Sequence, residues 1–553
     1  MSPPSEIVLG IDLGTTNSAC AIVHEGRASV VRRGAERIIP SVVAAMADGS
    51  IVVGAEARRQ LASNPSQVVF GAKRLIGRRF GSPQVQRMRR VVPYRIVEGS
   101  NETVMVELGG RTVSVVEIAA YILQYLRQMT EEALGQRVRR CVISVPAGFS
   151  DSQRSATRVA ARLAGLDVIR VINEPTAAAL AYGYIEDTDK RLAVYDFGGG
   201  TFDVTILQIT RNVFEVLSTS GEMFLGGDDI DDAIVQRMVA AYEKNHGTSV
   251  RHNVAALQRL RATAERMKVE LSELPTLTVK VDDVLPGSGK GLVFSLDQQQ
   301  LRELIEPLIR RTYTICQDAL ATAGIDRGQV DEVVLVGGTT RLPQVREVAT
   351  EAFARVPQTT INPMSVVAVG AAIQGAALLG SLVPMAGSRS RSALMSNDAV
   401  LLDVTPRSLG VGTLGGNVDF IIERNSVIPT EQTRVFTTTV DGQQHVRIQV
   451  CQGESGSFDE NTKLGELVLT GIVSADRGEA SIAVTFEINA DGILEVRALD
   501  QDTGQERVAT LSVPGELLPE ELARIGRTTD YVAEGQVTAG PPHRAVTEYP
   551  ARG

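Results

Sequence analysis

The chain has 553 residues, which exceeds what one hydrophobic core usually supports, so we expect two or more domains. Hydrophobic residues make up 43% and charged residues 22% of the chain, as in soluble globular proteins. The net charge of -9 and the 4% content of aromatic residues argue against a general nucleic-acid binder. Four well-separated cysteines, no signal-peptide pattern and no membrane-spanning run favour core thiols in a cytoplasmic protein.

The first motif lies at residues 8–18, where an apolar strand ends in Asp12 and a glycine turn leads into a second apolar strand. Glycine lets backbone N–H groups approach phosphate oxygens, while a carboxylate can hold a hydrated divalent cation. Alone, such a turn also fits an ordinary tight hairpin. The turn residues are Gly14, Thr15, Thr16 and Asn17.

From residue 6 to about residue 380, strands and helices mix in an α/β pattern. We interpret the basic run from Lys73 to Arg90 as a solvated face. Residues 141–146 predict a buried strand, and residues 151–163 predict a helix with Asp151 as its N-cap. Glu174 precedes Pro175, which places this carboxylate at a helix start; a capping role is the alternative to a catalytic one.

A second copy of the first motif lies at residues 194–203. Its apolar strand carries Asp196, and Thr201 and Asp203 follow the turn. The three glycines of the turn are Gly198, Gly199 and Gly200. Because Asp12 aligns with Asp196, the repeat predicts two related half-domains that face each other and hold one nucleotide in a cleft.

Three later segments add candidate residues to this cleft. Gly226 and Gly227 precede a helix that begins near Asp231, and a helix N-terminus can face anions. A predicted helix at 254–271 places Glu265, Lys268 and, just past its end, Ser272 on one side. The segment 333–341 repeats the strand-to-glycine turn with Gly337, Gly338 and Arg341.

The composition divides the chain into four parts. We predict a nucleotide-binding α/β domain at 6–380, a Pro/Gly/Ser/Arg-rich linker at 381–403, a β-sandwich of about eight short strands at 404–513, and a short helix with a disordered tail at 514–553. The linker ends in an apolar segment that contains Leu401 and Leu402 and precedes Asp403. Such a segment should dock against another part of the protein.

These residues resemble the heat-shock protein 70 (DnaK) chaperones, a family within the actin and sugar-kinase superfamily of ATPases. The resemblance extends from residue 7 to about residue 513. It is carried by residues 11–17, 73–80, 172–183, 195–203, 335–343 and 400–406. It implies an actin-like (ribonuclease H-like) two-lobed α/β ATPase domain followed by a β-sandwich.

The resemblance also implies ATP hydrolysis to ADP and phosphate, coupled to capture of unfolded polypeptide. By position, Thr15, Thr16 and Thr201 would contact phosphates, and Lys73 and Glu174 would flank the γ-phosphate and the attacking water. Mg²⁺ and a monovalent cation, K⁺, would be organised by Asp12, Asp196 and Asp203. Asp203 would also be catalytic, together with Lys73, Glu174 and Thr201. Adenosine would be held by Glu265, Lys268, Ser272, Gly338 and Arg341.

Further roles follow from the resemblance. Pro146 and Arg154 match a switch pair that reports the nucleotide state, and Arg170, Asn173 and Asp403 match the surface for a J-domain co-chaperone. A nucleotide exchange factor is also implied, as is a role in the stress response. The peptide groove and its arch would involve Leu414, Phe436, Thr439, Gln443 and Val446, because an extended peptide is held by backbone hydrogen bonds and one pocketed aliphatic side chain.

The chain departs from the family pattern at several positions. Gly148 stands where an aromatic residue is usual, Arg407 replaces an apolar residue after the linker, and Met364-Ser365 replaces an acidic pair. The linker contains a Ser/Arg insertion, and the helical lid is nearly absent, which predicts fast peptide exchange and weak peptide retention. These departures favour a specialised paralogue.

Two alternatives remain beside an ATP-driven chaperone. One is a small-molecule or sugar kinase of the same superfamily, against which the β-sandwich and the apolar linker argue. The other is an uncoupled nucleotide-bound holdase or an exchange-factor-like scaffold. Gly148 and the missing lid favour this second alternative, whereas Lys73, Glu174, Thr201 and the apolar linker favour an active ATPase.

Overall fold

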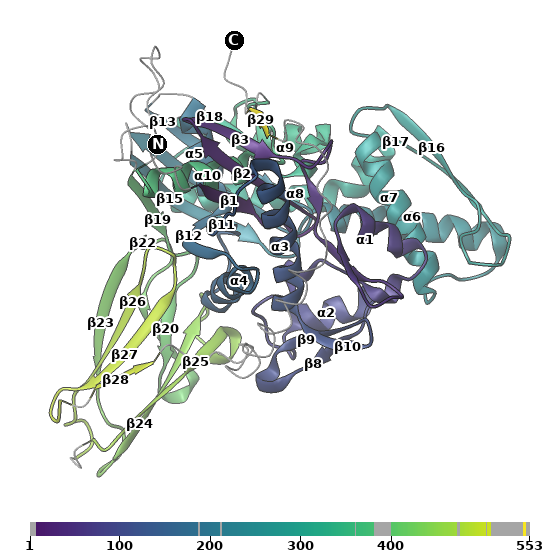
Figure 1. Ribbon diagram of the computed structural model, residues 1–553. Helices are drawn as coiled ribbons and strands as arrows, with labels where there is room; N and C mark the ends of the chain where they lie inside the picture. The colour runs from purple at the N-terminus through teal and green to yellow at the C-terminus, as the bar shows by residue number, and fades with distance from the viewer. Residues whose placement is uncertain are drawn as a thin grey trace.

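The computed structural model describes residues 7–185, 189–210, 213–359, 361–380, 400–472, 476–504, 506–509 and 546–548. The chain forms two lobes and a β-sandwich. The sandwich lies at one end of the lobes, beside α4 (Asp151–Leu163) and β12 (Asp167–Asn173) (Figure 1). The Ser/Arg-rich part of the predicted linker and the predicted short helix at 516–525 fall outside the described residues. Within the described ranges, no helix has both the length and the apolar character needed to cross a membrane.

The first lobe is built on a sheet in the order β12-β11-β1-β2-β3-β29, and β4 also pairs with β2. β1 runs parallel to β11 and antiparallel to β2, so the β1–β2 hairpin lies at the centre of the sheet. The other strands of this lobe form two small three-stranded sheets. The bounds are β1 (Val8–Asp12), β2 (Asn17–His24), β3 (Arg27–Val31), β4 (Ile39–Pro40), β5 (Val42–Ala45), β6 (Ile51–Val53), β7 (Val68–Phe70), β8 (Ile96–Glu98), β9 (Val104–Leu108), β10 (Arg111–Ser114), β11 (Arg140–Val145) and β29 (Val546–Glu548).

The second lobe repeats this plan in a sheet of order β18-β13-β14-β15-β19-β22. β13 runs parallel to β18 and forms an antiparallel hairpin with β14, as β1 does with β11 and β2. The structure thus confirms the two related half-domains that the repeated motif predicts. The bounds are β13 (Lys190–Phe197), β14 (Phe202–Thr210), β15 (Val213–Glu222), β18 (Glu332–Val336), β19 (Val400–Val404) and β22 (Val427–Ile428), and a separate hairpin comprises β16 (Thr276–Val281) and β17 (Leu292–Asp297).

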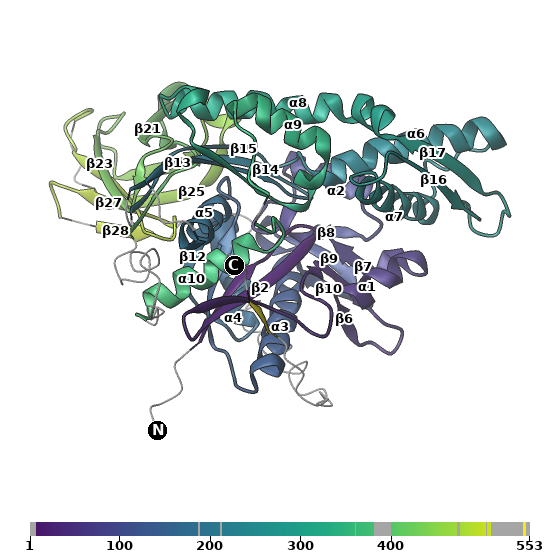
Figure 2. The ribbon, with the colours of Figure 1, turned by 90° about the horizontal axis from the view of Figure 1, so that it is seen from above.

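Two helices, α5 (Glu174–Ile185) and α10 (Val366–Leu378), lie between the two sheets (Figure 2). Both are rich in alanine, and their residues share one buried apolar cluster with the sheet strands. A Cβ on Gly370 would fall within 3.0 Å of the Ala177 backbone, so glycine is required for this close helix contact. The two lobes are therefore packed on a common hinge core.

The remaining helices cover the outer faces of the lobes, with α3 on the first lobe and α8 on the second (Figure 2). Buried apolar residues of α3 belong to the core of the first lobe, and those of α8 belong to the core of the second. Their bounds are α1 (Ala55–Arg59), α2 (Pro83–Val91), α3 (Val115–Leu134), α6 (Gly227–His246), α7 (Val254–Glu270), α8 (Gln298–Thr322) and α9 (Pro343–Phe353).

The sandwich consists of two four-stranded sheets, in the orders β21-β20-β24-β25 and β23-β26-β27-β28. Side chains of β26 and β27 alternate between buried and more exposed positions, which confirms the period-two pattern predicted for this region. The inner faces share one apolar cluster. The bounds are β20 (Leu409–Gly412), β21 (Val418–Ile422), β23 (Thr430–Phe436), β24 (His445–Gln452), β25 (Thr462–Thr470), β26 (Ile482–Ile488), β27 (Leu494–Asp500) and β28 (Glu506–Ala509).

The apolar end of the linker is strand β19, and it joins the sandwich to the second lobe. Leu401 and Leu402 pair in parallel with β15, while Asp403 and Val404 pair antiparallel with β22 of the sandwich region. Leu401 packs against the hinge core between the lobes. The docking expected for this apolar segment is confirmed, because its first three residues pair with β15 and its last two with β22.

A second contact between the sandwich and the first lobe centres on Asp491. Its carboxylate accepts hydrogen bonds from Arg158 (2.6 Å) and from the Val171 amide (3.1 Å), and it forms an ion pair with Arg170 (3.4 Å). Close by, the Leu494 amide donates to Asp151 (2.7 Å). One loop of the sandwich is therefore fixed to both α4 and β12.

Three local details differ from the sequence predictions. Ser150, not Asp151, is the N-cap of α4, where it forms a capping box with Gln153. This frees the Asp151 carboxylate for the sandwich. Helix α6 begins at Gly227 instead of near Asp231. Residues 546–548 of the predicted disordered tail form β29, which pairs with the edge strand β3.

Docking of the sandwich should weaken as the pH rises from about 4 to about 6. Burial raises the pKa of Asp151 to about 6, against the opposing effects of the Leu494 amide and Arg154. The docked state therefore binds more protons than an undocked state with an ordinary Asp pKa, and a difference of two pKa units corresponds to about 3 kcal/mol. The protection factor of the Leu494 amide in hydrogen exchange measures this effect.

The control for this prediction is Asp151→Asn, which keeps a hydrogen-bond acceptor but cannot titrate. In this variant, the protection factor of the Leu494 amide should change much less between about pH 4 and about pH 6. Equal pH dependence in both proteins would contradict the assignment to Asp151.

Candidate functional site

The turns of the two central hairpins line one cavity of about 80 Å³ between the lobes. The two motifs of the sequence repeat contribute matching residues to it, one set from each lobe. The cavity brings together most of the predicted phosphate-site residues: Asp12, Gly14, Thr15, Thr16, Asn17, Lys73, Glu174, Asp196, Gly198, Gly199, Gly200, Thr201, Gly337 and Gly338.

A buried ion pair joins Lys73 to Glu174 inside this cavity. Lys73 lies in the 3-10 turn Ala72–Arg74 of the first lobe, and Glu174 is the first residue of α5. The two side chains are 8% and 9% exposed, so each charge depends on the other for compensation. Glu174 thus accepts a hydrogen bond from Lys73 across the site. This contact is additional to the helix-capping role that its position at the start of α5 would allow.

Three aspartates lie around this ion pair: Asp196 and Asp203 are buried, and Asp12 is half-buried. Burial raises the pKa of Asp12 to about 7, and the charge of Glu174 acts in the same direction. Burial and Glu174 also raise the pKa of Asp203 to about 7, while the pKa of Asp196 lies well above its ordinary value. Such a group favours a bound cation, since positive charge stabilises the ionised carboxylates.

Among the described residues, no cluster of three or more His, Cys, Asp or Glu side chains is arranged to hold a metal ion alone. Asp12 and Asp196 reach the cavity, whereas Asp203 lies on the wall of a neighbouring one. A divalent cation at this position would complete its shell with water and phosphate oxygens, as Mg²⁺ commonly does. The donor set fits a cation that arrives with a phosphate ligand.

The glycine turn is held rigidly by the start of α6. The Gly227 amide donates to Gly198 O (3.0 Å), and the Gly226 amide donates to Asp229 (3.0 Å). Both N–H groups are engaged within the protein and shape the turn, and contact of Gly226 and Gly227 with a phosphate stays a prediction. A Cβ on Gly200 would lie 2.6 Å from the Thr15 methyl group, so the two glycine turns approach each other too closely for a side chain at this position.

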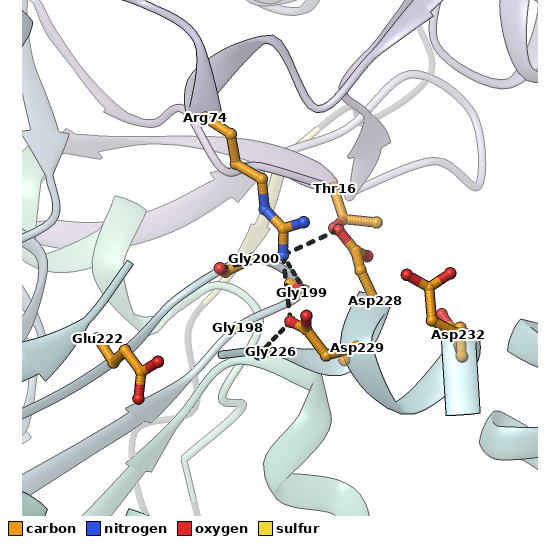
Figure 3. A network of polar contacts seen from close by, with 12 residues as sticks. Thr16, Arg74, Gly198, Gly199, Gly200, Glu222, Gly226, Asp228, Asp229 and Asp232 are labelled. Carbon is orange, nitrogen blue, oxygen red and sulfur yellow. Dashed lines mark hydrogen bonds and ion pairs between the residues drawn. The ribbon is translucent and has the colours of Figure 1, made fainter. Parts of the chain in front are cut away.

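Arg74 closes the cleft between the lobes. The sequence analysis missed this role, because it assigned Arg74 to a solvated basic face. From the first lobe, its guanidinium donates to the carbonyls of Gly200 (3.1 Å) and Gly199 (3.4 Å) on the second lobe (Figure 3). It also forms ion pairs with Asp228 (3.4 Å) and Asp229 (3.5 Å). The sequence did contain a signal for this role, because Arg74 directly follows Lys73 in a motif of the predicted phosphate site.

A larger cavity of about 660 Å³ continues from Thr15 and Thr16 toward the open side of the cleft. Glu265 lines it and pairs with Arg58 of the first lobe, a bridge between lobes that the sequence did not reveal. Lys268 is half-buried and donates to Asp231 (2.9 Å) and Gly227 O (3.0 Å). Asp231 of α6 and Glu265 of α7 line the cavity from the second lobe, and Lys268 holds Asp231 from behind.

Three predicted adenosine residues, Lys268, Ser272 and Arg341, are not among the described residues that line the two cavities. The Ser272 hydroxyl donates to the Val269 carbonyl (2.6 Å) at the end of α7. Arg341 is exposed at the end of the 3-10 turn Gly338–Arg341.

The predicted switch and linker residues form one hydrogen-bonded path. Arg154 donates to Asn173 (2.6 Å) and to the carbonyl of Ala147 (3.3 Å), next to Pro146. Asn173 in turn donates to Asp403 (2.8 Å). Because Asn173 is followed directly by Glu174, the linker strand is connected through one side chain to the ion pair of the cavity.

The predicted peptide-groove residues lie on the sandwich. Gln443 accepts from the Thr439 amide (3.0 Å), so these two residues are together at the β23–β24 loop. Phe436 and Val446 pack at the edge of the sandwich core and are partly buried. Leu414 is 67% exposed in the 3-10 turn Leu414–Gly416 between β20 and β21.

The two lobes, their paired hairpin turns and the carboxylate-lined cavity define the class of protein: an actin-like nucleotide-binding domain followed by a β-sandwich. The family model described as Hsp70 protein matches residues 8–539 of the chain. The protein therefore belongs to the Hsp70 family, whose members are ATP-dependent chaperones that use Mg²⁺ and act with client polypeptides and co-chaperones.

Gly200→Ala should weaken ATP binding by at least roughly tenfold, or about 1.4 kcal/mol. The new methyl group would lie 2.6 Å from the Thr15 methyl group and 2.9 Å from Arg74 Nε, so the cradle would have to open. Isothermal titration calorimetry with MgATP measures the change.

Gly81→Ala is the matched control, because a Cβ on Gly81 has no neighbour within 4 Å among the described residues. It should bind ATP like the wild type. Wild-type affinity in Gly200→Ala would contradict the assignment of this turn to the phosphates.

Proposed function

We propose that this protein hydrolyses ATP and couples hydrolysis to the binding of extended hydrophobic segments of unfolded proteins. The observation that carries the proposal is the shared strand β19, which pairs with the second lobe on one side and with the sandwich region on the other. Any rearrangement of the lobes must therefore act on the strand that leads into the sandwich.

Lys73, Glu174 and Thr201 have the proposed catalytic roles. The buried Lys73 ammonium would stabilise charge at the transferred phosphoryl group, and Glu174 would orient the attacking water. The Thr201 hydroxyl would contact phosphate. MgATP, when bound, supplies the reacting phosphoryl group and a cation that offsets the charge of Asp12 and Asp196. A K⁺ ion beside these carboxylates is part of the same proposal.

The path from Asp403 to Glu174 gives the proposed coupling a physical route. Asp403 is buried, and burial raises its pKa even though Asn173 and Arg154 stabilise the charged form. Opening of the hinge core would expose this carboxylate and break its hydrogen bond to Asn173. Linker docking and the position of Glu174 are thus expected to change together.

The sandwich would bind one extended peptide segment at Phe436, Gln443 and Val446, beneath Leu414 and Thr439. Backbone hydrogen bonds to a strand edge would give affinity, and an aliphatic pocket would give selectivity. A J-domain co-chaperone is proposed to contact the region of Arg170, Asn173 and Asp403. A nucleotide exchange factor is proposed to act on the open side of the cleft.

The proposal predicts that ATP weakens peptide binding. A fluorescein-labelled Leu-rich heptapeptide should bind with an affinity at least roughly tenfold lower in ATP than in ADP, as fluorescence anisotropy would show. Val446→Asp should weaken peptide binding in ADP by at least roughly tenfold, because a charge would enter the pocket.

Val468→Asp provides the control, since Val468 is an exposed valine on the neighbouring strand β25. It should bind peptide like the wild type. Peptide affinity that is the same in ATP and ADP would contradict the coupling and favour the uncoupled holdase or scaffold, for which the glycine at position 148 argues.

A further inference from the structure

A cavity of about 520 Å³ lies in the first lobe, and the proposed function gives it no role. Residues of α1, β6, α3 and the loop after β3 line it, and β6 contacts both helices (Figure 2). None of the described residues that line it also lines the phosphate cavity, and only Arg59 also lines the larger cavity of the cleft. What this cavity binds must therefore be inferred from its own side chains.

One face of α3 lines the cavity with polar and aromatic side chains. The face consists of Tyr121, Gln124, Tyr125 and Gln128, whose spacings of three and four residues place them on the same side of the helix. Tyr121 and Gln124 are only 3% and 5% exposed, so this is not an ordinary solvated face. The Tyr121 hydroxyl donates to Glu117 (2.8 Å), which leaves its ring to form part of the wall. A polar face is thus enclosed within the first lobe.

The Gln124 amide has hydrogen-bonding groups that no described residue satisfies. Neither a hydrogen bond nor an ion pair joins this side chain to another described residue. An amide offers two N–H donors and one carbonyl acceptor, and buried polar groups are nearly always bonded to protein, water or a ligand. Of the described cavities, Gln124 lines this one alone. Its amide is therefore available to a molecule inside this cavity.

The charged side chains of the lining balance each other. Two positive charges come from Arg33 and Arg59, and two negative charges come from Glu36 and Glu56. Arg33 is also held by Glu132, which lies outside the lining, at 3.2 Å. Because neither sign is in excess, the lining offers a phosphate or another polyanion no net attraction. It favours a ligand without net charge.

The rest of the lining is largely aliphatic or aromatic. Ile51 and Val53 of β6 are half-buried and line the cavity together with the rings of Tyr121 and Tyr125. The Arg33 guanidinium lies over the Tyr125 ring, 5.7 Å from its centroid, so a charge and an aromatic surface share one wall. Such surfaces can pack against the C–H groups of a ligand ring, whereas amide, carboxylate and guanidinium groups can bond to its hydroxyl groups.

We propose that this cavity binds a neutral, hydroxyl-rich ligand of the size of a mono- or disaccharide. A hydroxyl group both donates and accepts, so a polyol satisfies the amides of Gln124 and Gln128 as well as the charged groups beside them. The cavity volume lies within the range of about 300–1,000 Å³ that is typical of small-molecule sites. The inference goes beyond the proposed function and depends neither on ATP hydrolysis nor on peptide binding.

Saturation-transfer NMR with the full chain tests the proposal. The ligands are D-glucose, D-galactose, myo-inositol, maltose and trehalose, each at about 5 mM, since the method detects millimolar affinities. At least one of them should receive saturation from the wild-type protein. Gln124→Leu should lower that signal by at least roughly fivefold, because the hydrogen bonds of the amide are lost. If no ligand of this panel receives saturation, or if Gln124→Leu leaves the signal unchanged, the proposal is wrong.

Gln124→Leu should fold, because it nearly keeps the size of the side chain and breaks no hydrogen bond between described residues. Should it fail to fold, Glu56→Leu decides, since Glu56 is exposed and lines the same cavity. Glu56→Leu should lower the signal by at least roughly twofold through the loss of one acceptor. An unchanged signal in this variant would then overturn the proposal.

Gln299→Leu is the matched control, because Gln299 is an exposed glutamine on α8 of the second lobe that donates to Glu303 (3.0 Å). It should give the wild-type signal, and a loss equal to that in Gln124→Leu would contradict the assignment to this cavity. The signal should also persist in excess MgADP, since the nucleotide occupies the cleft. A signal that MgADP abolishes would place the sugar in the cleft and refute the proposal.

Discussion

The structure depends on one strand that belongs to two domains. β19 extends the sheet of the second lobe through β15 and pairs with β22 at the start of the sandwich, so its backbone groups are satisfied only when both domains are in place. Asp403 on this strand is buried against Asn173 and Thr176 of the hinge core. A buried carboxylate with these partners would be costly to leave unpaired, which makes docking cooperative instead of gradual.

The second constraint is the concentration of negative charge at the cleft. Asp12, Asp196, Asp203 and Glu174 lie in or beside the phosphate cavity with Lys73 as their one buried cationic partner among the described residues of that cavity. This group is unfavourable without further positive charge, which explains why a cation and the closure of the lobes belong together. Arg74 supplies the closure by reaching across the cleft to the glycine turn. A nucleotide site and a conformational sensor therefore arise from the same residues.

Much of this arrangement could be predicted from the sequence. The repeat of an apolar strand, an aspartate and a glycine turn predicted both lobes, and period-two patterning predicted the sandwich. Lys73 and Glu174 were placed by their motifs, but their ion pair joins residues 101 positions apart, which local patterns do not reveal. For the same reason, Arg74 was interpreted as a surface charge, although it reaches across the cleft to the glycine turn. Asp151 was predicted to cap its own helix, but it accepts a hydrogen bond from Leu494 of the sandwich. Capping rules consider one helix at a time, so they cannot reveal a contact that depends on how two domains pack.

The central claim is that the docked linker couples ATP hydrolysis to peptide binding. The most direct measurement is steady-state ATP turnover with and without an unstructured Leu-rich peptide, in the wild type and in a variant with Leu401→Asp and Leu402→Asp. The account predicts that peptide accelerates turnover in the wild type and that the double change abolishes this response, because two carboxylates cannot dock against β15 and the hinge core. If ATP is hydrolysed but peptide never alters the rate, or if the variant responds like the wild type, the account is contradicted.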